Sequence, residues 1–141
     1  MMRRWMNAVD LLCESANETK VPLDSDDNPL IDMDDRPIAT NADGTVTLYH
    51  RTSEDAARQI KRTGRFLSKE NTREVFFSDR PDGQAASFGD YVVQVKVRPN
   101  LTRLTDAMHG EMYVAVSTRY LSARNIMRVY AAPEEGADTY L

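Results

Sequence analysis

Few side chains in this sequence are suited to chemistry. The chain of 141 residues has one cysteine and two histidines, His50 and His109. A serine nucleophile would need a Gly-x-Ser-x-Gly elbow, which the sequence lacks. Neither histidine has a partner at helical spacing, and no glycine-rich phosphate loop is present, so no metal-site or P-loop motif is found. What remains is His50, Ser78 beside two aromatic residues, and Glu111 in front of an apolar strand.

His50 lies near the end of a predicted strand that leads directly into a helix. Residues 46–51 alternate between apolar and polar side chains, the period of a half-buried strand. Thr52 or Ser53 then offers an N-cap oxygen, and Thr52 with Asp55 three residues later is typical of a capping box. Gly64 sits where a left-handed helix end is expected. The histidine is therefore predicted to sit between a strand end and a helix N-terminus, where it could bind a polar ligand.

The rest of the chain predicts short strands with little helix. Strands are expected at 65–67, 75–78, 91–98, 101–104, 112–116 and 125–130, and helical turns at 84–88 and 119–123. No internal repeat or low-complexity segment is evident. The pattern predicts an α+β fold with two packed, mostly antiparallel sheets and few short helices.

Charge divides the chain into two parts. Residues 1–45 carry a net charge of −6, and residues 46–141 a net charge of +2. We therefore expect an N-terminal part, 1–45, and a folded domain, 46–141. The first part begins with an amphipathic helix over about residues 3–15, either packed on the domain or bound to a partner. It continues as an acidic, proline-interrupted segment, 17–43, expected to wrap around the domain.

Composition also excludes several classes of protein. No apolar run approaches the roughly 18 residues that cross a bilayer, and no signal peptide is recognised. The lone Cys13 cannot form a disulfide framework. These features predict a cytoplasmic protein without a membrane partner. The mildly basic body suits a phosphate-bearing ligand but lacks the basic stripe of a nucleic-acid binder, which argues against a nucleic-acid partner.

Several motifs, taken in order, resemble one enzyme family. Residues 49–52, Tyr-His-Arg-Thr, are similar to the Tyr-His-Gly-Thr strand end of ADP-ribosyltransferases of the diphtheria-toxin and poly(ADP-ribose)-polymerase type. That family continues with a helix ending in glycine, two aromatic residues eleven apart, a Val-Val-x-Val strand and a glutamate that opens a strand. The matching positions here are Gly64, Phe77 and Phe88, residues 92–95, and Glu111. The resemblance covers residues 46–130.

The resemblance implies an ADP-ribosyltransferase-like fold with NAD⁺ as co-substrate in a cleft between the sheets, and no metal. It implies Glu111 and His50 as catalytic residues. Glu111 would bind the ribose 2′-hydroxyl and stabilise the positive charge that develops as nicotinamide leaves. The implied NAD⁺-binding residues are His50, Arg51, Thr52, Phe77, Ser78 and Phe88. His50 would bind the adenosine ribose, the Arg51 backbone the carboxamide, and the two aromatic rings the flat nicotinamide cation.

This sequence departs from the family pattern at three places. Phenylalanine replaces tyrosine at both aromatic positions, and Arg51 replaces glycine. Relatives that modify arginine carry Glu or Gln two residues before the key glutamate. His109 stands there, which argues against an arginine acceptor. The expected acceptor is a protein, because the small size and acidic leader resemble stand-alone transferases of phages and mobile elements that act on host proteins.

Two alternatives to transfer onto a protein stay open at this stage. One is an RNA 2′-phosphotransferase, whose early Tyr-His-Gly-Thr strand is similar and which would not require Glu111. The other is an inactive relative that binds a host protein through its N-terminal part. Whether ADP-ribose passes to an acceptor or to water is equally open.

Overall fold

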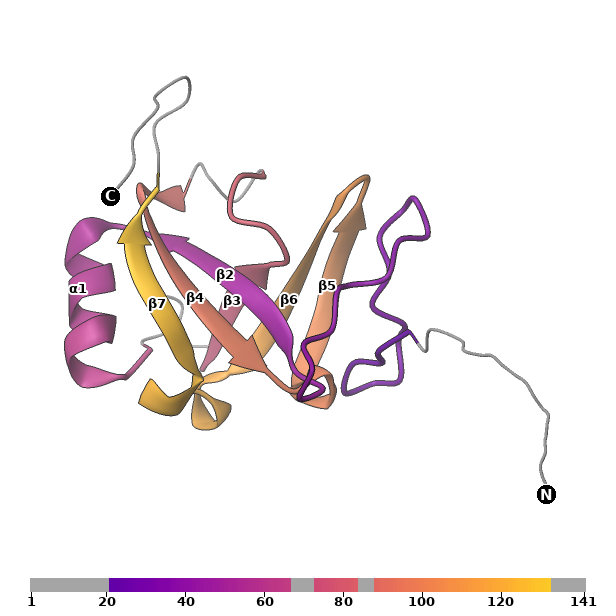
Figure 1. The fold of residues 1–141 in the computed structure, drawn as a ribbon, viewed down its shortest axis with the longest axis horizontal. Coiled ribbons are helices and arrows are strands. Elements are labelled where there is room, and N and C mark those ends of the chain that lie inside the picture. The colour runs from indigo at the N-terminus through magenta and orange to yellow at the C-terminus, as the bar shows by residue number, and fades with distance from the viewer. Residues whose placement is uncertain (1–20, 67–72, 84–87, 133–141) are drawn as a thin grey trace.

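The computed structural model describes residues 21–66, 73–83 and 88–132, which form one six-stranded antiparallel sheet and a single α-helix (Figure 1). The strand order is β5-β6-β3-β2-β4-β7. The elements in chain order are β2 (Val46–Thr52), α1 (Glu54–Thr63), β3 (Glu74–Ser78), β4 (Tyr91–Val97), β5 (Thr102–Met108), β6 (Glu111–Ser117) and β7 (Ile126–Ala131). The described residues also include short 3₁₀ turns at Pro99–Leu101, Thr118–Tyr120 and Ala123–Asn125.

The sheet is continuous but weakly joined in the middle. Every residue of β2 pairs with β4, from Val46 with Val97 to Thr52 with Tyr91. Towards β3, by contrast, β2 pairs only at Tyr49 with Ser78. The predicted α+β class is therefore confirmed, while the predicted pair of separate sheets is replaced by one sheet with a narrow junction between β2 and β3.

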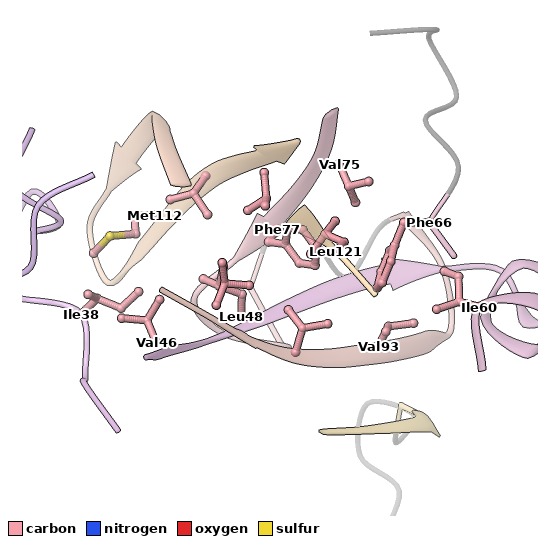
Figure 2. Packing of buried hydrophobic residues seen from close by; sticks show 14 of the residues in the cluster. Ile38, Val46, Leu48, Ile60, Phe66, Val75, Phe77, Val93, Met112 and Leu121 are labelled. Carbon is pink, nitrogen blue, oxygen red and sulfur yellow. The ribbon is translucent and has the colours of Figure 1, made fainter. Parts of the chain in front are cut away.

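One face of this sheet carries the core. Strand alternation turns Val46, Leu48 and His50 of β2 to the same side as Phe77 of β3 and Met112 of β6. Figure 2 shows side chains from both halves of the sheet meeting in one cluster. All of these except His50 are buried. The opposite face carries the alternate residues, among them Tyr49, Arg51, Phe76, Ser78, Glu111 and Tyr113. We call it the Glu111 face.

Helix α1 has well-formed ends. Ser53 is the N-cap, and its hydroxyl accepts a hydrogen bond from the Ala56 N–H at 3.2 Å. Thr52, the other candidate cap, is the buried last residue of β2 instead. Gly64 ends the helix in the left-handed conformation at φ +71°, as expected, and donates its N–H to the Ile60 carbonyl. A side chain there would also collide with Ala123, so both the backbone conformation and the lack of space require glycine.

The acidic segment before β2 folds into three consecutive tight hairpin turns. In each turn, the backbone N–H of an Asp or Asn donates a hydrogen bond to the carbonyl of the residue four positions later. In the first turn, the Asp24 N–H donates to the Asn28 carbonyl at 2.9 Å. The equivalent bonds are Asp32 to Arg36 and Asn41 to Thr45, and the left-handed residues are Asp27, Asp35 and Gly44. This is the geometry of a type I turn followed by a glycine-type bulge.

The first two turns are copies of one octapeptide. Residues 23–30 (Leu-Asp-Ser-Asp-Asp-Asn-Pro-Leu) and 31–38 (Ile-Asp-Met-Asp-Asp-Arg-Pro-Ile) share the pattern aliphatic, Asp, any, Asp, Asp, any, Pro, aliphatic. The expectation that the chain has no internal repeat was therefore wrong. The repeat is hard to recognise in the sequence because it is short and its variable positions differ in chemistry. It becomes evident from the turn geometry that the two copies share.

Both copies dock on edge strand β5 in the same way (Figure 1). Ser25 N–H donates to the Thr102 carbonyl at 2.7 Å, and Met33 N–H donates to the Met108 carbonyl at 2.9 Å. In return the Asp24 carboxylate accepts the Leu104 N–H, and the Asp32 carboxylate accepts the Gly110 N–H. The predicted wrapping segment is thus observed over its described part, and it covers an edge that would otherwise be open to pairing.

The remaining expectations on elements have mixed outcomes. Residues 64–66 are not a strand, β5 is longer than the predicted 101–104, and the other predicted strands lie within about one residue of β3, β4, β6 and β7. The N-terminal helix at 3–15, Leu67 and most of the helical turn at 84–88 lie outside the described residues. Within the described part, no helix is long and apolar enough to cross a membrane.

Candidate functional site

Glu111 opens β6 with a buried carboxylate. Its side chain is on the Glu111 face, and the residue is 4 % exposed. The Ser78 hydroxyl, itself buried, donates a hydrogen bond to Glu111 Oε2 at 2.6 Å. Tyr113, two residues on and therefore on the same face, also hydrogen-bonds this carboxylate. Burial raises the pKa of Tyr113, and the negative charges of Glu111 and Asp106 raise it further.

A turn after β3 covers the Glu111 carboxylate. Ser78 Oγ accepts the Arg80 N–H at 3.1 Å, which begins the turn. Gly83 then lies directly against both carboxylate oxygens of Glu111, so closely that a Cβ at this position would overlap them. We call residues 79–83 the covering segment. Glycine at 83 is what allows this segment to approach the carboxylate.

Arg51 holds the covering segment in place. Its Nη1 donates to the Pro81 carbonyl at 2.6 Å, and its Nε donates to the Gly89 carbonyl at 2.9 Å. The guanidinium thus joins both described ends of the β3–β4 connection to β2. The long side chain of Arg51 therefore has a defined position on the Glu111 face.

A second carboxylate lies close to Glu111. Asp79 Oδ1 accepts the Met112 N–H at 2.9 Å, and the Asp79 N–H donates to the Met112 carbonyl at 3.2 Å. Burial raises the pKa of Asp79 above its usual range, and the charges of Glu111 and Asp32 act in the same direction. The site is therefore rich in negative charge, which favours a cation or developing positive charge nearby.

His50 does not lie beside Glu111. Its neighbour Tyr49 is in line with Ser78 and Tyr113, so alternation turns the imidazole to the core face, opposite to Glu111. There its ring is 5.6 Å from the Phe77 ring and 6.3 Å from the Phe66 ring, measured between centroids. The expectation that His50 and Glu111 face one groove is thus not confirmed. His50 Nδ1 lies 3.0 Å from the Phe76 carbonyl, which can only accept, so Nδ1 carries the proton.

The two predicted aromatic residues differ in accessibility. Phe77 is 2 % exposed and belongs to the core cluster, so its ring is closed to a ligand. Phe88 is 69 % exposed. Phe76, which the motif resemblance does not single out, is 50 % exposed and shares the Glu111 face with Ser78. Strand alternation could have identified Phe76 from the sequence. Phe77 and Ser78 are adjacent and therefore point to opposite faces, whereas Phe76 and Ser78 share one face.

The other predicted site residues have structural contacts. Thr52 is buried, and its backbone packs against Gly89. His109, in the β5–β6 turn, has its Nδ1 2.7 Å from Asp34 Oδ1 of the second octapeptide. Among the described residues, no three His, Cys, Asp or Glu side chains are grouped so that they could hold a metal ion.

Comparison of the chain with protein-family models, with curated protein sequences and with solved structures gave no match.

Proposed function

We propose that the protein is an NAD⁺-dependent ADP-ribosyltransferase whose reaction centre is the Glu111 face. The observation that carries the proposal is the Glu111 carboxylate at the start of a strand, fixed by the Ser78 hydroxyl at 2.6 Å. The resemblance of residues 46–130 to the transferase family supports it, because an aromatic residue, a serine and then a glutamate that opens a strand follow the histidine strand in the family's order.

The chemistry needs an anion at this point. The bond between ribose C1′ and the nicotinamide nitrogen breaks, and its electron pair leaves with neutral nicotinamide. Positive charge then develops on the ribose, and a carboxylate beside the 2′-hydroxyl stabilises the transition state more than the ground state. An acceptor nucleophile, which we propose belongs to a protein, bonds to C1′ and loses its proton.

The aromatic part of the proposal changes from the sequence prediction. Phe76 lies on the Glu111 face and replaces the buried Phe77 as the ring that stacks on nicotinamide, with Phe88 as a second exposed ring. An aromatic face attracts the flat pyridinium cation by cation–π interaction. His50 becomes a positioning residue, since its bond to the Phe76 carbonyl fixes β3 against β2 where their backbones separate.

Access to the carboxylate requires movement of the covering segment. Gly83 occupies the space directly against Glu111, so ribose can reach this side chain only when residues 79–83 move away. The bond from Arg51 to Pro81 opposes that movement, and the bond from Arg51 to Gly89 fixes the guanidinium that holds Pro81. We therefore propose that NAD⁺ binding and the release of these bonds are coupled.

The test is mass-spectrometric detection of ADP-ribose on proteins incubated with NAD⁺. Glu111→Gln keeps the size of the side chain and removes its charge, and should lower the rate on the order of 10²–10³-fold. Glu54→Gln, on the exposed surface of α1, is the matched control and should label like wild type. Equal labelling by wild type and Glu111→Gln would refute the mechanism.

A binding module without catalysis is the second candidate. The cover over Glu111 and the position of His50 on the opposite face favour it. NAD⁺ binding without release of nicotinamide would support this reading, whereas nicotinamide release that depends on Glu111 would exclude it.

A further inference from the structure

A pocket lies at the far end of the sheet from Glu111. It is an open concavity of about 380 Å³ between the end of β4 and the two 3₁₀ turns that follow β6. In Figure 1 these turns are at the lower end of the sheet, whereas the β5–β6 turn that precedes Glu111 is at the upper end. The pocket shares no lining residue with the Glu111 site. Its volume is within the range of small-molecule sites.

The lining of this pocket is cationic. Lys96, Arg98 and Arg124 contribute to it, and among the described lining residues there is no carboxylate. Lys96 forms an exposed ion pair with Asp43 at 3.3 Å. Within the described part of the chain, Arg98 and Arg124 form no ion pair, so no described carboxylate neutralises their charges.

The polar wall of the pocket is fixed before any ligand binds. Asn125 Nδ2 donates to the Lys96 carbonyl at 3.0 Å, and Asn125 Oδ1 accepts the Ser122 N–H at 2.9 Å. These bonds tie the turn that carries Arg124 to the end of β4. A preformed wall reduces the entropy lost on binding, which favours a specific ligand over loose ion condensation.

The pocket also offers a ring and an apolar surface. Tyr120 lines it and is 42 % exposed, and Leu101 also lines it. The guanidinium carbon of Arg119 is 5.3 Å from the centroid of the Tyr120 ring. Arginine pairs with phosphate oxygens through parallel N–H donors, and an aromatic ring stacks on a planar base.

We propose that this pocket binds a phosphate monoester attached to a planar ring, the chemistry of a mononucleotide. Arg98, Arg124 and Lys96 hold the phosphate, and Tyr120 holds the ring. The Ser122 hydroxyl supplies a further polar contact. The inference does not depend on the activity proposed for Glu111.

The experiment is a titration of the full chain with AMP, adenosine and inorganic phosphate, followed by amide chemical shifts and by calorimetry. AMP should shift the amides of Ser122 and Asn125 and bind at least tenfold more tightly than adenosine. Equal binding of AMP and adenosine would overturn the proposal, as would absence of AMP binding.

Variants assign the binding to this pocket. Arg98→Gln with Arg124→Gln should weaken AMP binding at least tenfold, and Tyr120→Ala should weaken AMP but leave inorganic phosphate unchanged. Arg58→Gln removes one exposed arginine from α1 and should bind like wild type. Unchanged AMP affinity in the double variant refutes the site. An equal loss in Arg58→Gln refutes it too, because it would reflect overall charge. Far-UV circular dichroism verifies that each variant is folded.

Discussion

Gly83 lies against the Glu111 carboxylate, with no room between them for even one additional carbon atom. The contact joins the turn after β3 to the first residue of β6, two positions that are 28 apart in sequence. It also explains why Glu111 is buried although it lies at a strand end beside a turn. The state of this single contact decides whether the carboxylate can meet a ligand.

Gly83→Ala should destabilise the protein by about 1–3 kcal/mol, the usual cost of forcing an extra methyl group into a filled space. The cost should nearly vanish in a Glu111→Ala background, where the overlapping carboxylate is absent. Urea unfolding of the two single variants and the double variant measures the coupling between the sites. An equal cost in both backgrounds would mean that the covering segment does not press on Glu111.

Ser78→Ala should also destabilise the protein, because it removes the hydroxyl that donates to the buried carboxylate and accepts the Arg80 N–H. We expect about 1–3 kcal/mol, typical of a buried charged group that loses one of its hydrogen-bond partners. Ser117→Ala, whose hydroxyl accepts a long 3.4 Å bond at an exposed turn, should cost less than about 0.5 kcal/mol. Similar losses in the two variants would argue against a special role for Ser78.

Sequence reasoning located the strand that carries Glu111 and the strand–helix unit around His50, because both have clear periodicity and caps. It did not foresee that the two side chains are on opposite faces. Whether residues of two different strands share a face depends on the register in which the strands pair. Here the register pairs Tyr49 with Ser78 and Ser78 with Tyr113, and these residues are far apart in sequence. Within β3 itself, alternation alone would have separated Phe77 from Ser78 and singled out Phe76.

Asp79→Asn should stabilise the protein near pH 7. Burial raises the pKa of Asp79, and the Glu111 and Asp32 charges add to this, so the ionised form is disfavoured in the folded state. A raised carboxyl pKa means that stability is highest at low pH and is lost as pH rises from the unfolded value of 3.8 through the folded pKa. The asparagine oxygen can still accept the Met112 N–H.

The advantage of Asp79→Asn should therefore shrink as pH falls towards 3.8 and be absent below it. Urea unfolding of both proteins between pH 3 and pH 8 measures the difference. Asp43→Asn provides the opposite case, because hydrogen bonds from Thr45 lower the pKa of Asp43 to about 2. Asp43→Asn removes this carboxylate and should lower the stability of the protein at neutral pH. A constant difference for Asp79→Asn across the pH range would exclude the charge explanation.

The N-terminal segment shows a different limit of sequence reasoning. Prolines and acids suggested an extended wrap, which is right in outline, yet the same residues encode two equivalent hairpins. The informative residues are Asp24 and Asp32, whose carboxylates accept backbone N–H groups two and four positions ahead. Such short-range bonds leave no apolar periodicity, so a search for amphipathic patterns does not register them. The partner strand β5 is likewise invisible from the segment alone.

The three hairpin turns make one further prediction about stability. Asp27 and Asp35 adopt left-handed backbone angles, at φ 63° and φ 60°, where the third turn has Gly44 at φ 87°. A side chain at such angles costs roughly 1–2 kcal/mol, which exceeds the entropy of about 0.4–1 kcal/mol that glycine adds to the unfolded chain. Asp27→Gly and Asp35→Gly should therefore each stabilise the protein by about 0.5 kcal/mol.

Asp26→Gly removes the same charge at a position without positive φ and should destabilise the protein by a similar amount. Thermal and urea unfolding of the three variants decide the matter, and a loss of stability in Asp27→Gly equal to that in Asp26→Gly would show that these turns store no strain.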